Sequence, residues 1–376
     1  MTSRVLIAGA GIAGPALAFW LHRAGFAVTV VEKAPRLRPG GQAVDLRGVA
    51  REVAARMGLD EEIRRASIHT AGFSTVDAAG ATLTSMRADE WNGDGQIAEI
   101  EILRGDLAGA LHAATAGDVG YVFGDRITAL HEGPDGVTVT FARSAQRMFD
   151  LVIGADGLHS GVRALAFGED PGCVRHLGVY VAYWSAPNHL GLQDWALAYY
   201  EPESSAGIRP VHGNRESIVY VSFRSPELAA ADQRDAAQQK GLVRERAAGM
   251  GWEVPTLLAG LDDAPDFYFD SCSQVVLDSW ARGRVGLLGD AAFSPSPLTG
   301  QGTSLALVGA YVLAGELAMS GDDLAAGLAT YERRMRDWVQ ETQRIGREGA
   351  DDSTLLAVAN GFTLPDYPNL RGRSAA

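Results

Sequence analysis

The sequence predicts an α/β fold in which a Rossmann-like nucleotide-binding domain surrounds an inserted antiparallel β-sheet domain and is followed by a long C-terminal helix. Three observations support this prediction. A glycine-rich loop over residues 9–14 lies near the start of the chain, and a second over residues 289–302 lies near its end. Between them, residues 173–269 are rich in alternating aromatic side chains, which suits an antiparallel sheet with one covered face. Both ends of the chain are therefore expected to build one nucleotide site.

The first loop lies in a strand–loop–helix–strand context. Residues 5–8 and 28–31 are short apolar runs, the pattern of parallel strands buried on both faces. Residues 15–23 between them have the pattern of a helix, which Gly25 can end in a left-handed conformation. A dinucleotide-binding fingerprint requires this context.

Each residue of this fingerprint has a physical role. Gly9 permits the tight turn, Gly11 lets a pyrophosphate approach the backbone, and Gly14 allows close packing of helix and strand. The helix N-terminus presents amide donors to phosphates. Glu32, at the end of the second strand, can accept hydrogen bonds from a ribose 2′-hydroxyl, which disfavours a 2′-phosphate at this place.

The second loop and a third motif also follow buried-strand patterns. Residues 285–288 precede the loop 289–302, in which prolines restrict the backbone and glycines allow close contact at the start of a helix. Asp290 can accept hydrogen bonds from sugar or polyol hydroxyls. The sequence Gly-Ala-Asp-Gly at 154–157, which contains Asp156, is the third motif.

The rest of the chain alternates helical and strand-like patterns. Helices are predicted over about 49–57, 101–112, 303–319 and 325–347, and strands over 121–123, 137–140 and 151–153. Residues 68–96 alternate weakly, which suggests strands of a different sheet, and the residues beyond Pro365 are expected to form a loose tail. The predicted domains are a nucleotide-binding domain of residues 1–70, 97–172 and 270–324, a substrate-binding domain of residues 71–96 and 173–269, and a C-terminal helix and tail of residues 325–376.

Composition narrows the class of protein. The 376 residues are 47% apolar and 21% charged, which is ordinary for a globular chain. The net charge of −13 makes a nucleic-acid partner unexpected, and no run of 18 or more apolar residues predicts a membrane span. The two cysteines, Cys173 and Cys272, lack metal-ligand spacing, so we expect buried thiols, no metal site and a cytoplasmic protein.

In order along the chain, the three motifs resemble those of the para-hydroxybenzoate-hydroxylase class (class A) of single-component, FAD-dependent monooxygenases. The short chain, and Gly40-Gly41 followed by Asp45-Leu46, are most similar to the tetracycline-inactivating and antibiotic-tailoring members. The resemblance covers roughly residues 4–347 and implies a GR2-type FAD-binding domain. Many members carry a histidine where this chain has Phe293, so no chemistry is assigned to that position.

The resemblance implies a cofactor site. Its residues in this chain are Gly9, Gly11, Ala13, Gly14, Glu32, Lys33, Arg38, Asp45, Arg104, Asp156, Asp290, Leu298, Gly300 and Gly302. The first glycines would hold the pyrophosphate and Glu32 the adenosine ribose. Arg104 and Asp290 would contact the ribityl or phosphate region, and residues 298–302 would present amides to the isoalloxazine ring.

For some of these residues the sequence allows either a cofactor contact or a structural role. By the resemblance, Arg38 and Asp45 fall among flavin- and NAD(P)H-associated positions, and Asp156, with Ser160 and Arg163, would contact both cofactors. Asp156 could instead form a turn through its own side chain. Arg104 could instead form a helix-surface salt bridge with Glu101 or Asp106.

The resemblance implies a monooxygenase that uses NAD(P)H and O2, through a flavin C4a-hydroperoxide, to oxygenate an aromatic or polyketide-like small molecule in antibiotic tailoring or inactivation. No catalytic side chain is identified, since the cofactor carries the chemistry. Tyr183, Arg209 and His212 are candidate substrate contacts, or else ordinary residues of a sheet surface. The expected assembly is a monomer or weak homodimer.

Three alternatives remain open. The chain could be an FAD halogenase, although the Trp-x-Trp-x-Ile-Pro signature is missing, or a reductase acting on C=C bonds. It could also use FAD structurally, as a cyclase scaffold or a module that sequesters a ligand, because the same pocket serves both purposes.

Overall fold

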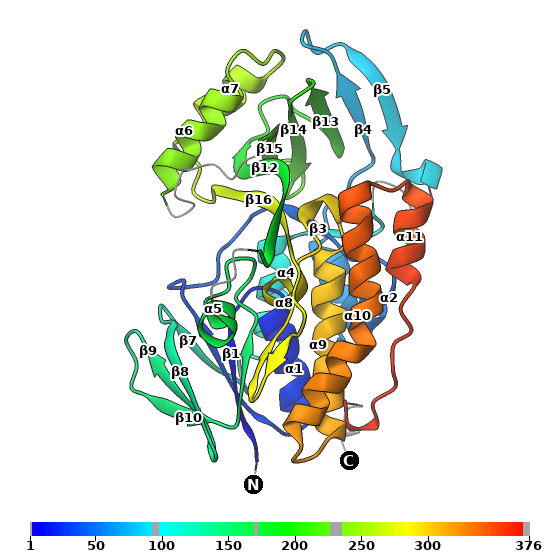
Figure 1. Cartoon of the computed structure of the whole chain (residues 1–376). Coiled ribbons are helices and arrows are strands. Elements are labelled where there is room, and N and C mark those ends of the chain that lie inside the picture. The colour runs from blue at the N-terminus through cyan, green and yellow to red at the C-terminus, as the bar shows by residue number, and fades with distance from the viewer. Residues whose placement is uncertain (1, 92–97, 169–171, 226–234, 371–376) are drawn as a thin grey trace.

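The computed structural model describes residues 2–91, 98–168, 172–225 and 235–370. It has two bodies, a lower one built on a parallel sheet and an upper one built on a second, larger sheet (Figure 1). Parts of four predictions lie outside the described residues: positions 92–96 of the weakly alternating segment, 169–171 at a predicted domain boundary, 226–234 of the aromatic insert and 371–376 of the tail.

The lower body contains a six-stranded sheet. Its strands, in spatial order, are β17 (Ala281–Arg282), β18 (Val285–Leu287), β11 (Leu151–Gly154), β1 (Arg4–Ala8), β2 (Ala27–Glu32) and β7 (Gly120–Phe123). All neighbours are parallel except β17 and β18. Strand β1 lies in the middle, and its residues Val5, Leu6 and Ile7 are fully buried, as expected for a strand covered on both faces. The two ends of the chain therefore meet in one sheet, as the sequence predicts.

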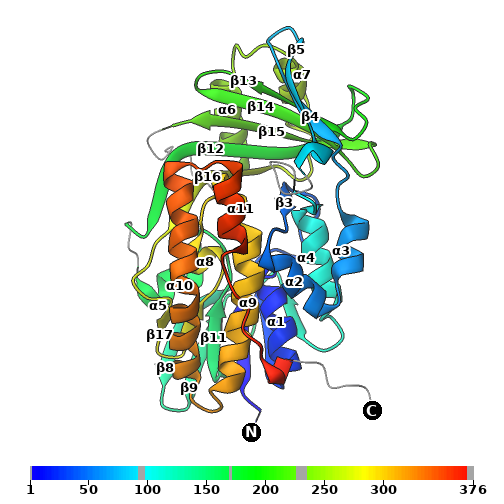
Figure 2. The same cartoon turned by 90° about the vertical axis from the view of Figure 1, so that its right-hand side faces the viewer.

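Helices cover this sheet. They are α1 (Ala13–Arg23), α2 (Val49–Met57), α3 (Asp60–Ala66), α4 (Arg104–Ala113), α5 (Gly161–Phe167), α8 (Asp290–Phe293), α9 (Gly302–Met319), α10 (Leu324–Glu348) and α11 (Asp352–Asn360). Helix α9 packs against α1 and α2 on one side and against α10 on the other (Figure 2). It is long and apolar enough to cross a bilayer, yet 83% of it is buried inside the molecule, which is typical of a core helix.

The upper body is a seven-stranded sheet. In spatial order its strands are β16 (Tyr268–Val275), β12 (Val174–Pro187), β15 (Glu216–Arg224), β14 (Ser204–Val211), β13 (Trp195–Tyr200), β4 (Gly72–Val76) and β5 (Thr82–Arg87). Neighbours are antiparallel except β13 and β4, which are parallel. Helices α6 (Ala236–Arg246) and α7 (Val254–Ala259) cover one face, where Val243 and Val254 join the core around Trp184. The opposite face is turned toward the lower body (Figure 2).

Smaller elements complete the structure. A three-stranded sheet consists of β10 (Arg147–Phe149), β9 (Gly136–Phe141) and β8 (Ile127–Gly133), and a two-stranded sheet of β3 (Ala43–Asp45) and β6 (Glu101–Leu103). Single 3-10 turns are η1 (Ala88–Trp91), η2 (Pro297–Thr299) and η3 (Pro368–Leu370). The helix predicted from residue 101 was therefore wrong in its first turn. Residues Glu101–Leu103 pair with β3 instead, and the helix begins at Arg104.

The predicted loose tail beyond Pro365 was also wrong as far as Leu370. Tyr367 is buried, its hydroxyl donates to Glu316 Oε1 at 2.6 Å, and its ring lies 5.2 Å from that of Tyr311. Leu370 is buried as well. A tail of mixed composition carries no helical or strand periodicity, so only its long-range contacts reveal that it is packed.

The carboxylate of Asp125 stabilises the loop that follows β7. Its carboxylate accepts hydrogen bonds from the backbone N–H of Arg126, Arg143 and Ser144 at 2.8–3.0 Å. Although burial by itself disfavours the charged form, these donors lower the pKa of Asp125 to about 2. A lowered pKa stabilises the folded state above the unfolded-state pKa of about 3.9, and this stabilisation is lost as the pH falls toward 2.

We therefore expect Asp125→Asn to lower the free energy of unfolding by about 1–2 kcal/mol at pH 7. The gap to the unmodified protein should narrow as the pH falls from about 4 toward 2. Urea denaturation at several pH values measures this gap, with Asp89→Asn, a change at an exposed side chain, as the control. A gap that does not change with pH would contradict the assignment.

Candidate functional site

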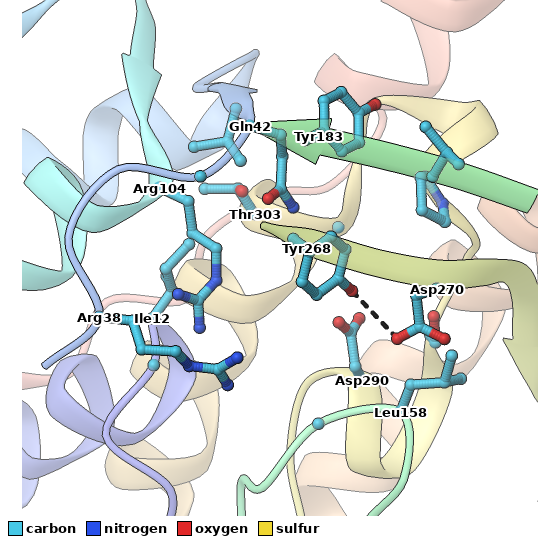
Figure 3. A pocket seen from close by; sticks show the side chains of 18 of the residues that line it. Ile12, Arg38, Gln42, Arg104, Leu158, Tyr183, Tyr268, Asp270, Asp290 and Thr303 are labelled. Atoms are coloured by element: carbon cyan, nitrogen blue, oxygen red, sulfur yellow. Dashed lines mark hydrogen bonds between the residues drawn. The ribbon is translucent and has the colours of Figure 1, made fainter. Parts of the chain in front are cut away.

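A cavity of about 1620 Å³ lies between the two bodies. Its lower wall is made by the loops that follow β1, β2 and β11, by residues 38–45, by the start of α4 and by the loop that precedes α9. Its upper wall is the face of the seven-stranded sheet that α6 and α7 leave uncovered. Figure 3 shows side chains from both walls converging on this space.

The first glycine loop is packed so tightly that side chains cannot be accommodated. A Cβ on Gly9 would lie 2.3 Å from the carbonyl oxygen of Ala155, and one on Gly14 would lie 1.9 Å from the carbonyl oxygen of Gly9. A Cβ on Gly11 would lie 3.1 Å from Arg104 Nη2. Gly9 also has a φ of 106°, which favours glycine. Gly9 and Gly11 line the cavity, as does Ala13, whereas Gly14 packs beneath it, as a helix-packing glycine should.

Glu32 closes the loop at the end of β2. Its two carboxylate oxygens accept hydrogen bonds from the backbone N–H of Ala10 and Ala34, each at 2.8 Å. Glu32 also lines the cavity, together with Lys33 and Arg38. The carboxylate thus holds the loop in place and keeps lone pairs available to a hydroxyl donor.

Arg104 projects from the first turn of α4 into the cavity (Figure 3). Burial, followed by the positive charge of Arg38, lowers its pKa. Within the described part of the chain its guanidinium has no ion-pair partner. The alternative of a surface salt bridge is wrong, because Glu101 pairs with Arg209, and Asp106 lies beside His212. A partly buried guanidinium without such a partner is suited to an anionic occupant.

Asp290 lies across the cavity at the start of α8 (Figure 3). Burial raises its pKa, and the charge of Arg104 opposes that shift. In the following loop Gly300 has a φ of 63°, and its Cβ position lies 3.4 Å from Asp45 Oδ2. Asp45, Asp290, Gly300 and Gly302 all line the cavity, whereas Leu298 does not and is 51% exposed.

Asp156 has a structural role. Ser160 Oγ donates to its Oδ1, and the backbone N–H of Val162 donates to its Oδ2 at 3.1 Å. Arg163 donates to the carbonyls of Ala291 and Leu158, so it ties the loop after β11 to α8. Burial raises the pKa of Asp156, and its bond to Ser160 opposes this. The geometry is that of the turn-forming alternative, although Asp156 also lines the cavity.

The three candidate substrate contacts lie in different environments. Tyr183 on β12 and Arg209 on β14 line the upper wall. His212 does not line the cavity; it lies just beyond β14, 3.1 Å from Glu216 Oε2 and 3.7 Å from Asp106 Oδ2. A one-residue change of strand phase reverses the face, so sequence alternation alone could not separate these positions.

Several cavity features had no sequence signal. Gln42 lines the cavity, and its buried side-chain oxygen has no partner among the described residues. Both polar side-chain atoms of buried Gln301, which does not line the cavity, also lack a partner among the described residues. The unsatisfied oxygen of Gln42 marks a place where an occupant of the cavity can complete the hydrogen bonding.

A hydrogen-bonded chain also leads from the cavity to the surface. The hydroxyl of Tyr268 donates to Asp270 Oδ2 at 3.0 Å, and Asp270 Oδ1 lies 3.0 Å from Nε2 of half-exposed His159 (Figure 3 shows the first of these bonds). These residues come from β16 and from the loop after β11. Their meeting depends on the packing of the two bodies.

Known proteins match the chain over nearly its whole length. The sequence model of the FAD binding domain family matches residues 2–345. An uncharacterised protein of Mycobacterium tuberculosis is 44% identical over 96% of this chain and 99% of its own. A flavin-dependent monooxygenase of Legionella longbeachae is 36% identical over 97% of this chain and 98% of its own.

A solved structure has the same architecture. The crystal structure of the tetracycline destructase Tet(51) superposes with a TM-score of 0.89, at 33% sequence identity, over 98% of this chain and 99% of that one. The arrangement of both sheets and of the long C-terminal helix is thus one that a solved protein of similar sequence also adopts.

Proposed function

This chain belongs to the FAD-binding-domain family of flavin-dependent monooxygenases, and from that membership we propose that it oxygenates an aromatic or polyketide-like small molecule with O2 and NAD(P)H. The observation that carries the proposal is a cavity in which the cofactor loops face the aromatic wall of the second sheet. A cytoplasmic location is part of the same proposal.

The residues that line the lower wall fit an extended FAD. Gly11, which has no side chain, lets a pyrophosphate approach the start of α1, and Glu32 offers its carboxylate to the adenosine ribose. Arg104 and Asp290 lie opposite each other, where a ribityl or phosphate group can bond to both. The buried side-chain oxygen of Gln42, which has no partner among the described residues, supports an occupant that donates a hydrogen bond.

FAD supplies the reactive oxygen chemistry when it is bound. The chain itself positions the substrate and limits the access of water to the cavity. The upper wall packs a substrate ring against Phe73, Val181 and Ile218, and the phenols of Tyr183 and Tyr220 offer oriented hydrogen bonds. Exclusion of water from this space favours transfer of oxygen to the substrate over loss of it to solvent.

The substrate class follows from the shape of the wall and from a similar protein. Tet(51) is named a tetracycline destructase, and the aromatic side chains of the upper wall suit a polycyclic compound of that type. We propose a role in antibiotic inactivation or tailoring on this basis.

Flavin reduction and product mass test the proposal together. Anaerobic mixing of the holoenzyme with NADPH should bleach the flavin, and a panel of tetracyclines, aromatic polyketides, rifamycins and simple phenols should accelerate NADPH oxidation. At least one member should then gain one oxygen atom. Dithionite, which reduces any accessible flavin, is the control for flavin that is bound but unreactive.

Each alternative predicts another outcome. A structural flavin would stay oxidised in NADPH while still bleaching with dithionite. A halogenase would give chloride-dependent products, and a C=C reductase would give a product two hydrogen atoms heavier without consuming O2. If no panel member speeds NADPH oxidation and none is oxygenated, the proposed substrate class is wrong.

A further inference from the structure

An ion pair joins the two bodies at the substrate end of the cavity. Arg209 Nη1, on β14 of the upper sheet, lies 2.9 Å from Glu101 Oε2, on β6 of the lower body. Glu101 is 3% exposed, and its Oε2 also accepts a hydrogen bond from Thr70 Oγ1 at 3.0 Å. Both Arg209 and Glu101 line the cavity. The guanidinium is therefore held from behind while part of it remains open to an occupant.

A second carboxylate lies in the same region. Asp45 lines the cavity beside this pair and bonds Arg47 Nε at 2.9 Å. Burial, followed by the charge of Glu101, raises the pKa of Asp45, and Arg47 and Arg209 oppose that shift. For Arg209, burial disfavours the charged form, yet Glu101 and Asp45 together raise its pKa above the ordinary value. Arg209 stays charged, and its charge is already compensated.

The rest of this wall adds hydrogen-bonding groups without net positive charge. Burial raises the pKa of Tyr183 to about 12, so its phenol is neutral at physiological pH. Tyr220 on the next strand has its pKa raised by burial as well, and its ring centre lies 6.4 Å from that of Tyr183. Among the described cavity-lining residues of the seven-stranded sheet, Arg209 is the one Arg or Lys.

We propose that the Arg209–Glu101 pair is a charge-neutral recognition subsite for an uncharged oxygen acceptor, such as a ketone or amide carbonyl, and that it rejects a carboxylate at the same place. Arg209 supplies the donor, and Glu101 is a positioning residue that fixes the guanidinium and cancels its charge. A ligand carboxylate at this place would lose its hydration beside Glu101 and Asp45, whose charges already compensate Arg209 and Arg47.

The proposal of this subsite rests on the proposed function in one respect, the expectation that the ligand is planar. It selects, within that class, carbonyl-rich compounds without an acidic group at this end, rather than aromatic acids. Because recognition is a binding property, its test needs neither NADPH nor oxygen transfer.

The test compares two ligands of nearly equal shape, anthraquinone-2-carboxamide and anthraquinone-2-carboxylate. Binding to the oxidised holoenzyme is measured at neutral pH from the change in flavin absorbance. The unmodified protein should bind the amide at least about tenfold more tightly than the carboxylate, since like charges at close range are unfavourable.

Two variants should move this preference in opposite directions. Glu101→Gln removes the carboxylate paired with Arg209 and leaves only Asp45 nearby, so the carboxylate ligand should gain about tenfold relative to the amide. Arg209→Gln leaves Glu101 uncompensated, so the carboxylate should lose affinity further relative to the amide. A pair with only a structural role would weaken both ligands alike in either variant.

Glu316→Gln is the matched control, because Glu316 is a buried carboxylate that bonds Tyr367 and Arg334 and does not line the cavity. This variant should keep the preference of the unmodified protein for the amide.

Thermal unfolding and FAD content show whether a variant has folded. If one of the two variants has not, the other still tests the direction in which the preference between carboxylate and amide changes. Equal affinity of the unmodified protein for both ligands, no binding of either, or shifts of the same sign in both variants would overturn the subsite. If a panel compound is oxygenated but both variants keep the unmodified preference between amide and carboxylate, the subsite is wrong and the proposed function stands.

Discussion

Gly14→Ala is expected to lower the affinity for FAD by about a hundredfold or more. The new Cβ would lie 1.9 Å from the carbonyl oxygen of Gly9 and 3.4 Å from the Ile7 side chain, so the helix must move away from the strand that carries the loop. Backbone displacement of this kind costs about 1–3 kcal/mol and often more, and each 1.4 kcal/mol lost from binding is a factor of ten. The loop and the helix N-terminus would no longer face the same phosphates.

Titration of apoprotein with FAD, followed by flavin fluorescence, measures the change. Gly109→Ala is the matched control, because Gly109 lies inside helix α4 and a Cβ there meets nothing within 4 Å. The control should bind FAD as the unmodified protein does. Thermal unfolding of the apoproteins separates loss of the site from loss of the fold. A Gly14→Ala protein that is purified with a full complement of FAD would contradict the role given to this glycine.

Tyr367→Ala is expected to lower the free energy of unfolding by about 3–5 kcal/mol. The Tyr367 ring fills the space above Gly315, where a Cβ would lie 2.2 Å from the ring, and it packs against the ring of Tyr311. Its hydroxyl bonds the buried carboxylate of Glu316, which is also an ion-pair partner of Arg334. Removal of the side chain leaves a cavity beside the core helix α9 and takes one donor from a buried charge.

Chemical denaturation of the apoprotein measures this effect without a contribution from bound FAD. Tyr367→Phe is the control, since it keeps the ring and loses one hydrogen bond, so its cost should be only about 1 kcal/mol. Equal losses in both variants would show that the bond to Glu316, rather than the packing of the ring, holds the C-terminal segment.

Local patterns predicted the cofactor half of the molecule well. The strand Arg4–Ala8, the helix that follows Gly9–Gly14 and the strand that ends at Glu32 all form where the apolar runs and glycines place them. The helices α2, α9 and α10 match their predicted ranges to within one residue. These elements are encoded by short-range periodicity and by backbone sterics, which a sequence displays directly.

The errors have a common physical cause. Glu101–Leu103 resemble the first turn of a helix, yet they pair with β3 because the two strands meet only after the chain has folded. Residues beyond Pro365 have no periodicity of their own, yet Tyr367 fits the space that Gly315 leaves. Contacts between residues far apart in sequence leave no local pattern, so propensity cannot anticipate them.

The sequence by itself determined the nucleotide-binding loops, the position of Glu32 at the end of the second strand, the family resemblance and the insertion of one body into the other. Each of these depends on residues that are neighbours in the chain. Only the tertiary structure decided which polar side chains share the cavity. It placed Arg209 beside Glu101, gave Arg104 no ion-pair partner among the described residues, bonded Asp156 to its own loop and put His212 outside the cavity lining. The charge of a site depends on distances across the fold, and these exist only once the two sheets have packed together.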